Sequence, residues 1–171
     1  AAGGYPYLTL NAYNPWALVQ SDQGLSLASA GQWVCDFAGA SNPSTGVTPA
    51  CLFGSAVIGG IPAVAIGWGL LLATIAITLW IVARRPDRLM LLTGLAVLAL
   101  AFFVIPTRVH ERYGYPFFAL GVILAAGTVR WRVAYVALSA ATFANMYVVL
   151  TTLYPGNPSI ADWLGIGSAI R

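Results

Sequence analysis

The sequence predicts an all-α membrane protein with about four transmembrane helices, preceded by an outer loop region with short helices. Of the 171 residues, 59% are hydrophobic and 8% are charged, against about 45–50% and about 25% in an ordinary soluble domain. Long uncharged runs follow residue 55, whereas residues 1–55 are rich in the Gly, Ser and Pro clusters typical of turns. Together these observations exclude a soluble enzyme and a disordered chain.

The charges also argue against nucleic acid as a partner. The net charge of +3 comes from eight arginines that are scattered along the chain and form no basic stripe. Membrane lipid is therefore the expected surroundings of the chain.

Residues 1–55 are expected to form an extracytoplasmic loop region, because no apolar run in them is long enough to cross a membrane. Both cysteines of the chain, Cys35 and Cys51, lie here. Disulfides persist outside the cytosol and are rare within it. We therefore expect a Cys35–Cys51 disulfide, with two free thiols as the alternative. Two cysteines and one distant histidine do not make a metal site, so no metal is expected in this segment.

Residues 56–153 are expected to form the transmembrane helical bundle. An uncharged run over 64–83 would be about 30 Å long as a helix, which matches the hydrocarbon core of a bilayer. The run over 115–129 is short for a span, so it must borrow a turn at one end or be surrounded by protein. Residues 154–171 are expected to be an extracytoplasmic tail. The four predicted spans cover residues 64–83, 89–105, 115–129 and 133–153.

Arginine counts beside the predicted spans set the orientation, because cytoplasmic loops are enriched in positive charge. One side carries five arginines and the other carries three. The side with five should be cytoplasmic, which leaves residues 1–55, the loop around His110 and the tail outside. The first group is Arg84, Arg85, Arg88, Arg130 and Arg132; the second is Arg108, Arg112 and Arg171.

The densest polar segment is the outer loop over residues 106–116, which holds the only histidine and the only glutamate of the chain. Arginine can bind phosphate oxygens with two parallel hydrogen bonds, and histidine can donate a hydrogen bond or shuttle a proton. This pattern predicts a phosphate site at the membrane surface. The alternative is an interfacial anchor of arginines and tyrosines. The proposed phosphate ligands are Arg112, His110 and Arg108, supported by Glu111 and Tyr113.

A second polar and aromatic cluster lies near the beginning of the chain. Asn11 and Asn14 are three residues apart, and so are Tyr13 and Trp16. Amide groups and aromatic faces suit a sugar, which accepts hydrogen bonds and stacks on rings. The alternative is an N-cap before a short helix that carries Trp16.

Both segments resemble the later half of bacterial GT-C-type membrane glycosyltransferases, and the mannosyltransferase-like members are the most similar. The stretch from His110 to Tyr113 is also similar to a motif of eukaryotic dolichol-dependent mannosyltransferases. The matching segments are Thr9-Leu10-Asn11-Ala12-Tyr13-Asn14-Pro15-Trp16, Pro106-Thr107-Arg108-Val109-His110-Glu111-Arg112-Tyr113 with Pro116, Asn145-Met146-Tyr147, Tyr154-Pro155 and Asp162-Trp163-Leu164-Gly165.

The resemblance implies an integral enzyme of the bacterial plasma membrane. Such an enzyme transfers a sugar, here most simply mannose, from a polyprenyl-phosphate donor to a glycan or lipid acceptor on the outer face, with inversion of the anomeric carbon. It implies that Arg112, His110 and Arg108 hold the phosphate of the sugar donor. It also implies that three residues shape the sugar or acceptor pocket, namely Asn11, Asn14 and Trp16.

The catalytic residue is not assigned in this chain. The resemblance places an acidic base in an outer loop that would precede Ala1, so we expect this chain to be a piece of a longer protein that is inactive alone. No cofactor is expected in this segment, although the resemblance leaves room for a divalent metal in the full enzyme. The alternative function is a non-catalytic membrane subunit or scaffold of an envelope-assembly complex.

Overall fold

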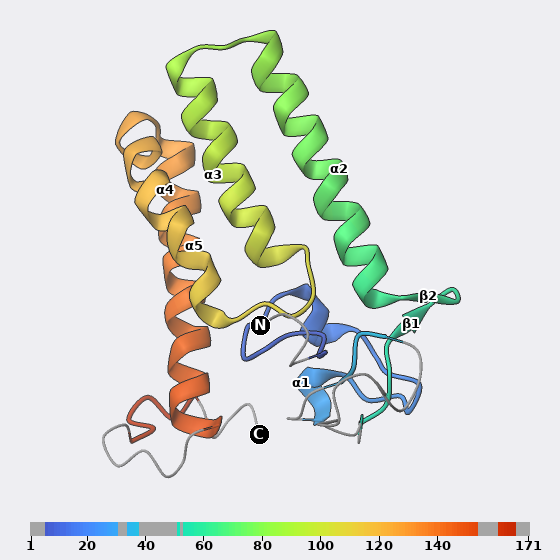
Figure 1. The fold of residues 1–171 in the computed structure, drawn as a ribbon. Helices are drawn as coiled ribbons and strands as arrows, with labels where there is room; N and C mark the ends of the chain where they lie inside the picture. Colours follow the sequence, from blue (N-terminus) through green and yellow to red (C-terminus); the bar gives the residue numbers. More distant parts are fainter. Residues whose placement is uncertain (1–5, 31–33, 38–50, 52, 154–160, 167–171) are drawn as a thin grey trace. The chain divides into compact units, whose positions relative to one another are not determined.

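The computed structural model is mostly helical and describes residues 6–30, 34–37, 51, 53–153 and 161–166 (Figure 1). The chain divides into two compact units, Ala1–Phe117 and Phe118–Arg171. In chain order, the described elements are η1 (Pro15–Leu18), α1 (Leu27–Ala30), β1 (Val57–Ile58), β2 (Ile61–Pro62), α2 (Ala63–Arg84), α3 (Arg88–Val104), η2 (Glu111–Gly114), α4 (Tyr115–Gly127), α5 (Val129–Val148) and η3 (Val149–Leu153).

The first unit combines a loop region with a helical hairpin of α2 and α3. Asp87 is the N-cap of α3, and its side chain accepts a hydrogen bond from Met90 N at 2.8 Å. The connection between the helices is so short that they run antiparallel and pack against each other (Figure 1). Gly94 permits the close approach: a Cβ at this position would lie 2.8 Å from a methyl group of Val82. Small residues allow such contacts between apolar helices.

The loop region has its own core beneath the start of α2. The core joins residues that are far apart in the sequence, namely Leu8, Trp16, Val34, Ala56 and Ala63. A hairpin of β1 and β2 leads from this core into α2. Its turn consists of Gly59 and Gly60, both with positive φ, which is the backbone form that tight hairpin turns require. This hairpin was not predicted from the sequence.

The second unit begins within α4 and continues through α5 and the π-helical turn η3. Arg132 Nε donates to the carbonyl of Ala125 at 3.4 Å, near the end of α4. Tyr147 joins α5 to the tail: its hydroxyl donates to Asp162 Oδ1 at 2.9 Å and accepts from Leu164 N at 2.7 Å. Of the predicted tail over residues 154–171, the structure describes only residues 161–166.

Helices occupy all four segments in which the sequence predicts spans, but α4 ends at Gly127 instead of residue 129, and α5 begins before the predicted fourth span. α5 begins at Val129 rather than at residue 133, because Thr128 is its N-cap and accepts a hydrogen bond from Trp131 N. The predicted connection containing Arg130 and Arg132 is therefore the first turn of a helix. The short third run does gain a turn at one end, since η2 leads directly into α4.

Two of the described helices are long and apolar enough to cross a membrane, namely α2 and the stretch Val129–Thr151. α2 has 22 residues and is about 33 Å long. α3 is apolar but shorter, with 17 residues. α4 has 13 residues and would be about 20 Å long. Beyond two helices, the number of membrane crossings stays a prediction.

Candidate functional site

A cavity of about 510 Å³ lies in the first unit, at the end of the α2–α3 hairpin that is opposite the turn between the two helices. It is formed by the N-terminal segment, the beginning of α2, the end of α3 and the loop that follows α3. This loop is the segment for which the sequence predicts a phosphate site. The lining residues are Leu10, Trp68, Phe102, Pro106, Thr107, Arg108, Val109, His110, Arg112 and Tyr113.

The loop is held by backbone pairing with the N-terminal segment. Leu10 N donates to the carbonyl of Val109 at 2.8 Å, and Arg108 N donates to the carbonyl of Tyr7 at 3.1 Å. Asn11 and Arg108 both have a φ of 63°. This left-handed conformation is tolerated by asparagine but costs other non-glycine residues about 1–2 kcal/mol. The surrounding contacts therefore hold Arg108 in a conformation that its backbone does not favour.

Gly67 of α2 brings the helix against the chain that enters this loop. A Cβ at Gly67 would lie 3.2 Å from three backbone atoms: the carbonyl oxygen of Ile105, Cα of Pro106 and N of Thr107. Only a residue without a side chain fits at this distance without moving its neighbours. The next residue, Trp68, lines the cavity.

Asn14 and Trp16, predicted to shape a sugar pocket, support the end of α3. Asn14 Nδ2 donates to the carbonyl of Phe103 at 3.2 Å, and Trp16 Nε1 donates to that of Ile105 at 2.6 Å. The last carbonyls of a helix lack partners within the helix, and these two side chains provide them. Asn14 is also the N-cap of η1, which is the alternative interpretation of this cluster. Asn11, Asn14 and Trp16 are not among the described residues that line the cavity.

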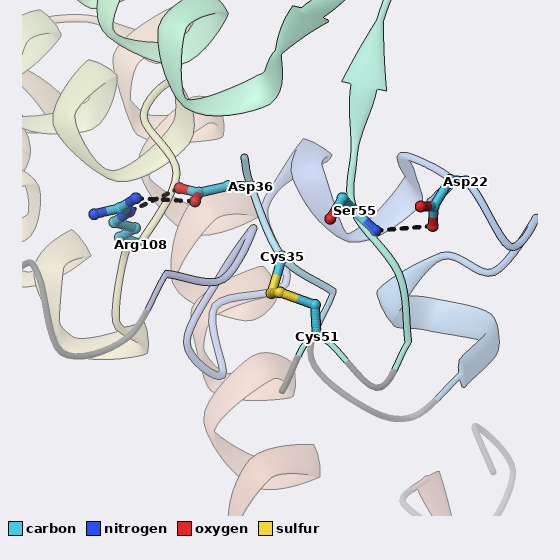
Figure 2. The surroundings of a disulfide bond; sticks show 6 residues. All are labelled: Asp22, Cys35, Asp36, Cys51, Ser55 and Arg108. Atoms are coloured by element: carbon cyan, nitrogen blue, oxygen red, sulfur yellow. Dashed lines mark hydrogen bonds and ion pairs between the residues drawn. A yellow bond between two sulfur atoms is a disulfide. The ribbon is translucent and has the colours of Figure 1, made fainter. Parts of the chain in front are cut away.

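Asp36 connects the disulfide region to the cavity (Figure 2). Its carboxylate is buried and accepts two hydrogen bonds from Arg108: from Nε at 2.8 Å and from the second guanidinium nitrogen Nη2 at 3.0 Å. The hydroxyl of Thr107 donates to the same carboxylate at 2.6 Å. The preceding residue, Cys35, forms a disulfide with Cys51, the pairing that the sequence analysis expects. The phosphate ligand predicted at Arg108 thus has a carboxylate as its partner.

Arg112 differs from Arg108 in this respect. Its side chain is exposed and lines the cavity, and it has no hydrogen bond or ion pair with the residues that the structure describes. His110 lies beside it and packs edge-on against Tyr113, with ring centroids 5.5 Å apart. The Nδ1 atom of His110 is 3.9 Å from Glu111 Oε2, so these two residues form an ion pair when the ring is protonated.

The five carboxylates of the chain all lie in its described part, and none lines the cavity. Asp36 binds Arg108, and Asp22 accepts a hydrogen bond from Ser55 N at 2.9 Å (Figure 2). Asp87 caps α3 and Asp162 binds Tyr147. No three His, Cys, Asp or Glu side chains of the described segments gather as metal ligands. Among the described residues, the cavity therefore presents arginine, histidine and aromatic side chains but no carboxylate.

The apolar wall of the cavity was missed by sequence reasoning. Trp68 and Phe102 belong to long apolar runs, in which nothing in the spacing separates a cavity residue from a lipid-facing one. Asp36 was missed as a partner of Arg108 because 72 residues separate the two in the sequence. The only local signal was its position next to Cys35, a residue expected to be fixed by a disulfide.

Comparisons with protein-family models, with curated proteins and with solved structures find no match for this chain, so its resemblance to GT-C-type glycosyltransferases stays a prediction from the sequence motifs.

Proposed function

We propose that the chain is the donor-binding part of an integral membrane glycosyltransferase. The enzyme would move a sugar, mannose on the resemblance, from a polyprenyl-phosphate donor to a glycan or lipid acceptor. The observation that carries the proposal is the cavity, which combines the guanidinium of Arg112 and the ring of His110 with the aromatic walls of Trp68 and Phe102. Among the described residues, this guanidinium has no ion-pair partner. A cationic end next to an apolar wall suits a phosphate that is attached to a hydrocarbon chain.

A membrane location is supported by the exposure of the apolar helices. Only 11% of the most apolar stretch of α2 is buried, and only 17% of that of α5. The core helix of a soluble protein buries most of such a stretch, whereas large apolar side chains of α2 such as Leu72, Leu79 and Trp80 face outward. Exposed apolar surface of this extent is stable in contact with lipid tails and costs free energy in contact with water.

The proposed orientation rests on the difference between the two ends of the α2–α3 hairpin. The turn end carries Arg84, Arg85 and Arg88, and the guanidinium of Arg84 lies 5.0 Å from the ring centre of Trp80. Positive charge is typical of the cytoplasmic end of a membrane helix, and tryptophan is enriched at both membrane interfaces. The cavity is at the opposite end of the same hairpin, so it would open at the outer face of a bacterial plasma membrane.

The transfer reaction gives the cations of the cavity a role. The acceptor oxygen forms a bond to the anomeric carbon of the sugar, while the bond from that carbon to the phosphate oxygen breaks. The electron pair of the broken bond stays on the polyprenyl phosphate, whose negative charge increases. Arg112 and His110 would stabilise that charge more in the transition state than in the ground state. The proton of the acceptor goes to a base that lies outside the described cavity.

A second candidate function is a non-catalytic subunit or scaffold. It is favoured by the structural bonds that the carboxylates of the chain make. Each of Asp22, Asp36 and Asp87 bonds to the protein's own groups at a structural position. On this alternative, the cavity would bind a prenyl phosphate or a phospholipid without turnover.

The distinguishing experiment is sugar transfer by the intact protein in lipid vesicles, measured with radiolabelled polyprenyl-phosphate mannose and a membrane-extract acceptor. We expect Arg112→Gln to lower the transfer rate at least about tenfold, because one cation that stabilises the leaving phosphate is lost. Arg88→Gln is the matched control, since Arg88 is an exposed arginine at the other end of the hairpin. Equal rates for both variants and the wild type would contradict the phosphate-binding role. Binding of the labelled lipid without any transfer would favour the scaffold.

A further inference from the structure

The two arginines of the cavity are in different electrostatic states. Arg108 donates two hydrogen bonds to one buried carboxylate, and its side chain is 24% exposed. Arg112 has no carboxylate partner in the described part of the chain. A carboxylate at 2.8 Å offsets most of the field of a guanidinium at the distance of a bound ligand. The charge available to an anion in the cavity is therefore mainly that of Arg112, since His110, which also lines the cavity, has Glu111 Oε2 3.9 Å from its Nδ1.

The environment of Asp36 points to a positioning role. Its side chain is completely buried and contacts both Thr107 and Arg108, which are lining residues of the cavity. Its backbone is also fixed, because its N–H donates to the carbonyl of Pro6 at 3.1 Å and its carbonyl accepts from Val64 N at 2.9 Å. One residue thus joins the disulfide region, the beginning of α2 and the cavity loop.

Stability alone does not account well for this arrangement. Burying an ion pair costs desolvation energy that often equals its attraction, so well-packed apolar residues serve stability as well or better. A buried carboxylate that binds with both oxygens does, however, fix the orientation of a guanidinium. It also determines how much positive charge the cavity presents.

We propose that Asp36 is a positioning residue of the cavity. Its carboxylate holds Arg108 and neutralises its charge, so that Arg112 and His110 bind the phosphate group of a ligand. This inference rests on the proposed function, since it assumes that the cavity binds a prenyl phosphate. It gives Arg108 a structural role, in contrast to the phosphate-binding role predicted from the sequence.

The test is the binding of farnesyl phosphate to the intact protein in detergent micelles, measured by calorimetry over a series of salt concentrations. Asp36→Asn removes the carboxylate that offsets the charge of Arg108 at the cavity wall. We expect this variant to bind the probe about threefold to tenfold more tightly than the wild type, with a steeper salt dependence. A purely structural role for Asp36 would give weaker binding.

A double variant keeps the proposal testable if the single variant does not fold. Asp36→Asn combined with Arg108→Gln replaces the ion pair by two amides, which leaves no unpaired buried charge. We expect it to bind farnesyl phosphate with the affinity of the wild type, because Arg112 and His110 are unchanged. A loss of about tenfold, equal to that of Arg112→Gln, would show that Arg108 grips the phosphate and would overturn the proposal.

The failure of the proposed function has a different signature. If farnesyl phosphate binds as described but no sugar is transferred, the enzyme proposal fails and the role of Asp36 stands. If the probe does not bind to the wild type, both proposals fail. Inorganic phosphate, titrated in parallel, is expected to bind more weakly, because it makes no contact with the apolar wall.

Discussion

The close approach of α2 to the cavity loop leads to a quantitative prediction at two neighbouring glycines. A Cβ at Gly67 would meet three backbone atoms at 3.2 Å, whereas a Cβ at Gly69 would meet no atom within 4 Å. Alanine in place of glycine within a helix contributes about 1 kcal/mol through helix propensity at either position. At Gly67 the added methyl group also displaces backbone, and overpacking of this kind costs about 1–3 kcal/mol. The difference in stability between the two variants therefore isolates the contact.

We expect Gly69→Ala to raise the free energy of unfolding above that of the wild type. The free energy of unfolding of Gly67→Ala should be about 1–3 kcal/mol lower than that of Gly69→Ala. The assay is unfolding by denaturant in detergent, monitored by tryptophan fluorescence. Because the displaced segment leads into the cavity loop, Gly67→Ala should also weaken the binding of farnesyl phosphate, and Gly69→Ala should not. Equal stability and equal binding for the two variants would refute the packing of Gly67 against residues 105–107.

Three further predictions concern contacts within single units, two in the first unit and one in the second. Replacing Cys35 and Cys51 together by serine should lower the free energy of unfolding by about 3 kcal/mol, the chain-entropy value for a disulfide with a separation of 16 residues; identical unfolding curves for the variant and the wild type would contradict this. Trp16→Phe should cost about 1 kcal/mol, since it removes the hydrogen bond to the end of α3, and an effect on farnesyl phosphate binding larger than on stability would restore the predicted pocket role of Trp16. Tyr147→Phe should speed limited proteolysis next to Asp162, because the hydroxyl that holds this segment is gone; an unchanged cleavage rate would argue against that contact.

The sequence was sufficient to locate the four apolar helices α2 to α5, because uncharged apolar runs and the residues that interrupt them are local signals. α2 and α3 begin within one residue of the predicted spans. The predicted start of α5 was wrong because Arg130 and Arg132 were interpreted as part of a connection between helices. Thr128 is the N-cap of α5, so both arginines belong to the first turn of this helix. Capping by a single side chain outweighed the charge pattern.

The candidate site could be predicted only in part. The loop with His110 and Arg112 was identified because it gathers scarce residue types within a few positions, and it does line a cavity. The different states of Arg108 and Arg112 depend on Asp36, which is remote in the sequence and becomes a neighbour only through the fold. The cluster of Asn14 and Trp16 was open to two interpretations. The hydrogen bonds of both side chains to the end of α3 favour a structural role, and their role in a sugar pocket stays a prediction. Residue types alone do not distinguish a side chain that binds a ligand from one that binds a helix end.

The most direct test of the central claim locates a prenyl phosphate on the intact protein in its membrane. A polyprenyl phosphate with a photoreactive group next to the phosphate is crosslinked to the protein, and the modified peptides are identified by mass spectrometry. We predict labelling of residues within 102–113 and around Trp68, with loss of labelling in Arg112→Gln and no change in Arg88→Gln. Labelling that is confined to other segments, or that is unaffected by Arg112→Gln, would contradict this prediction.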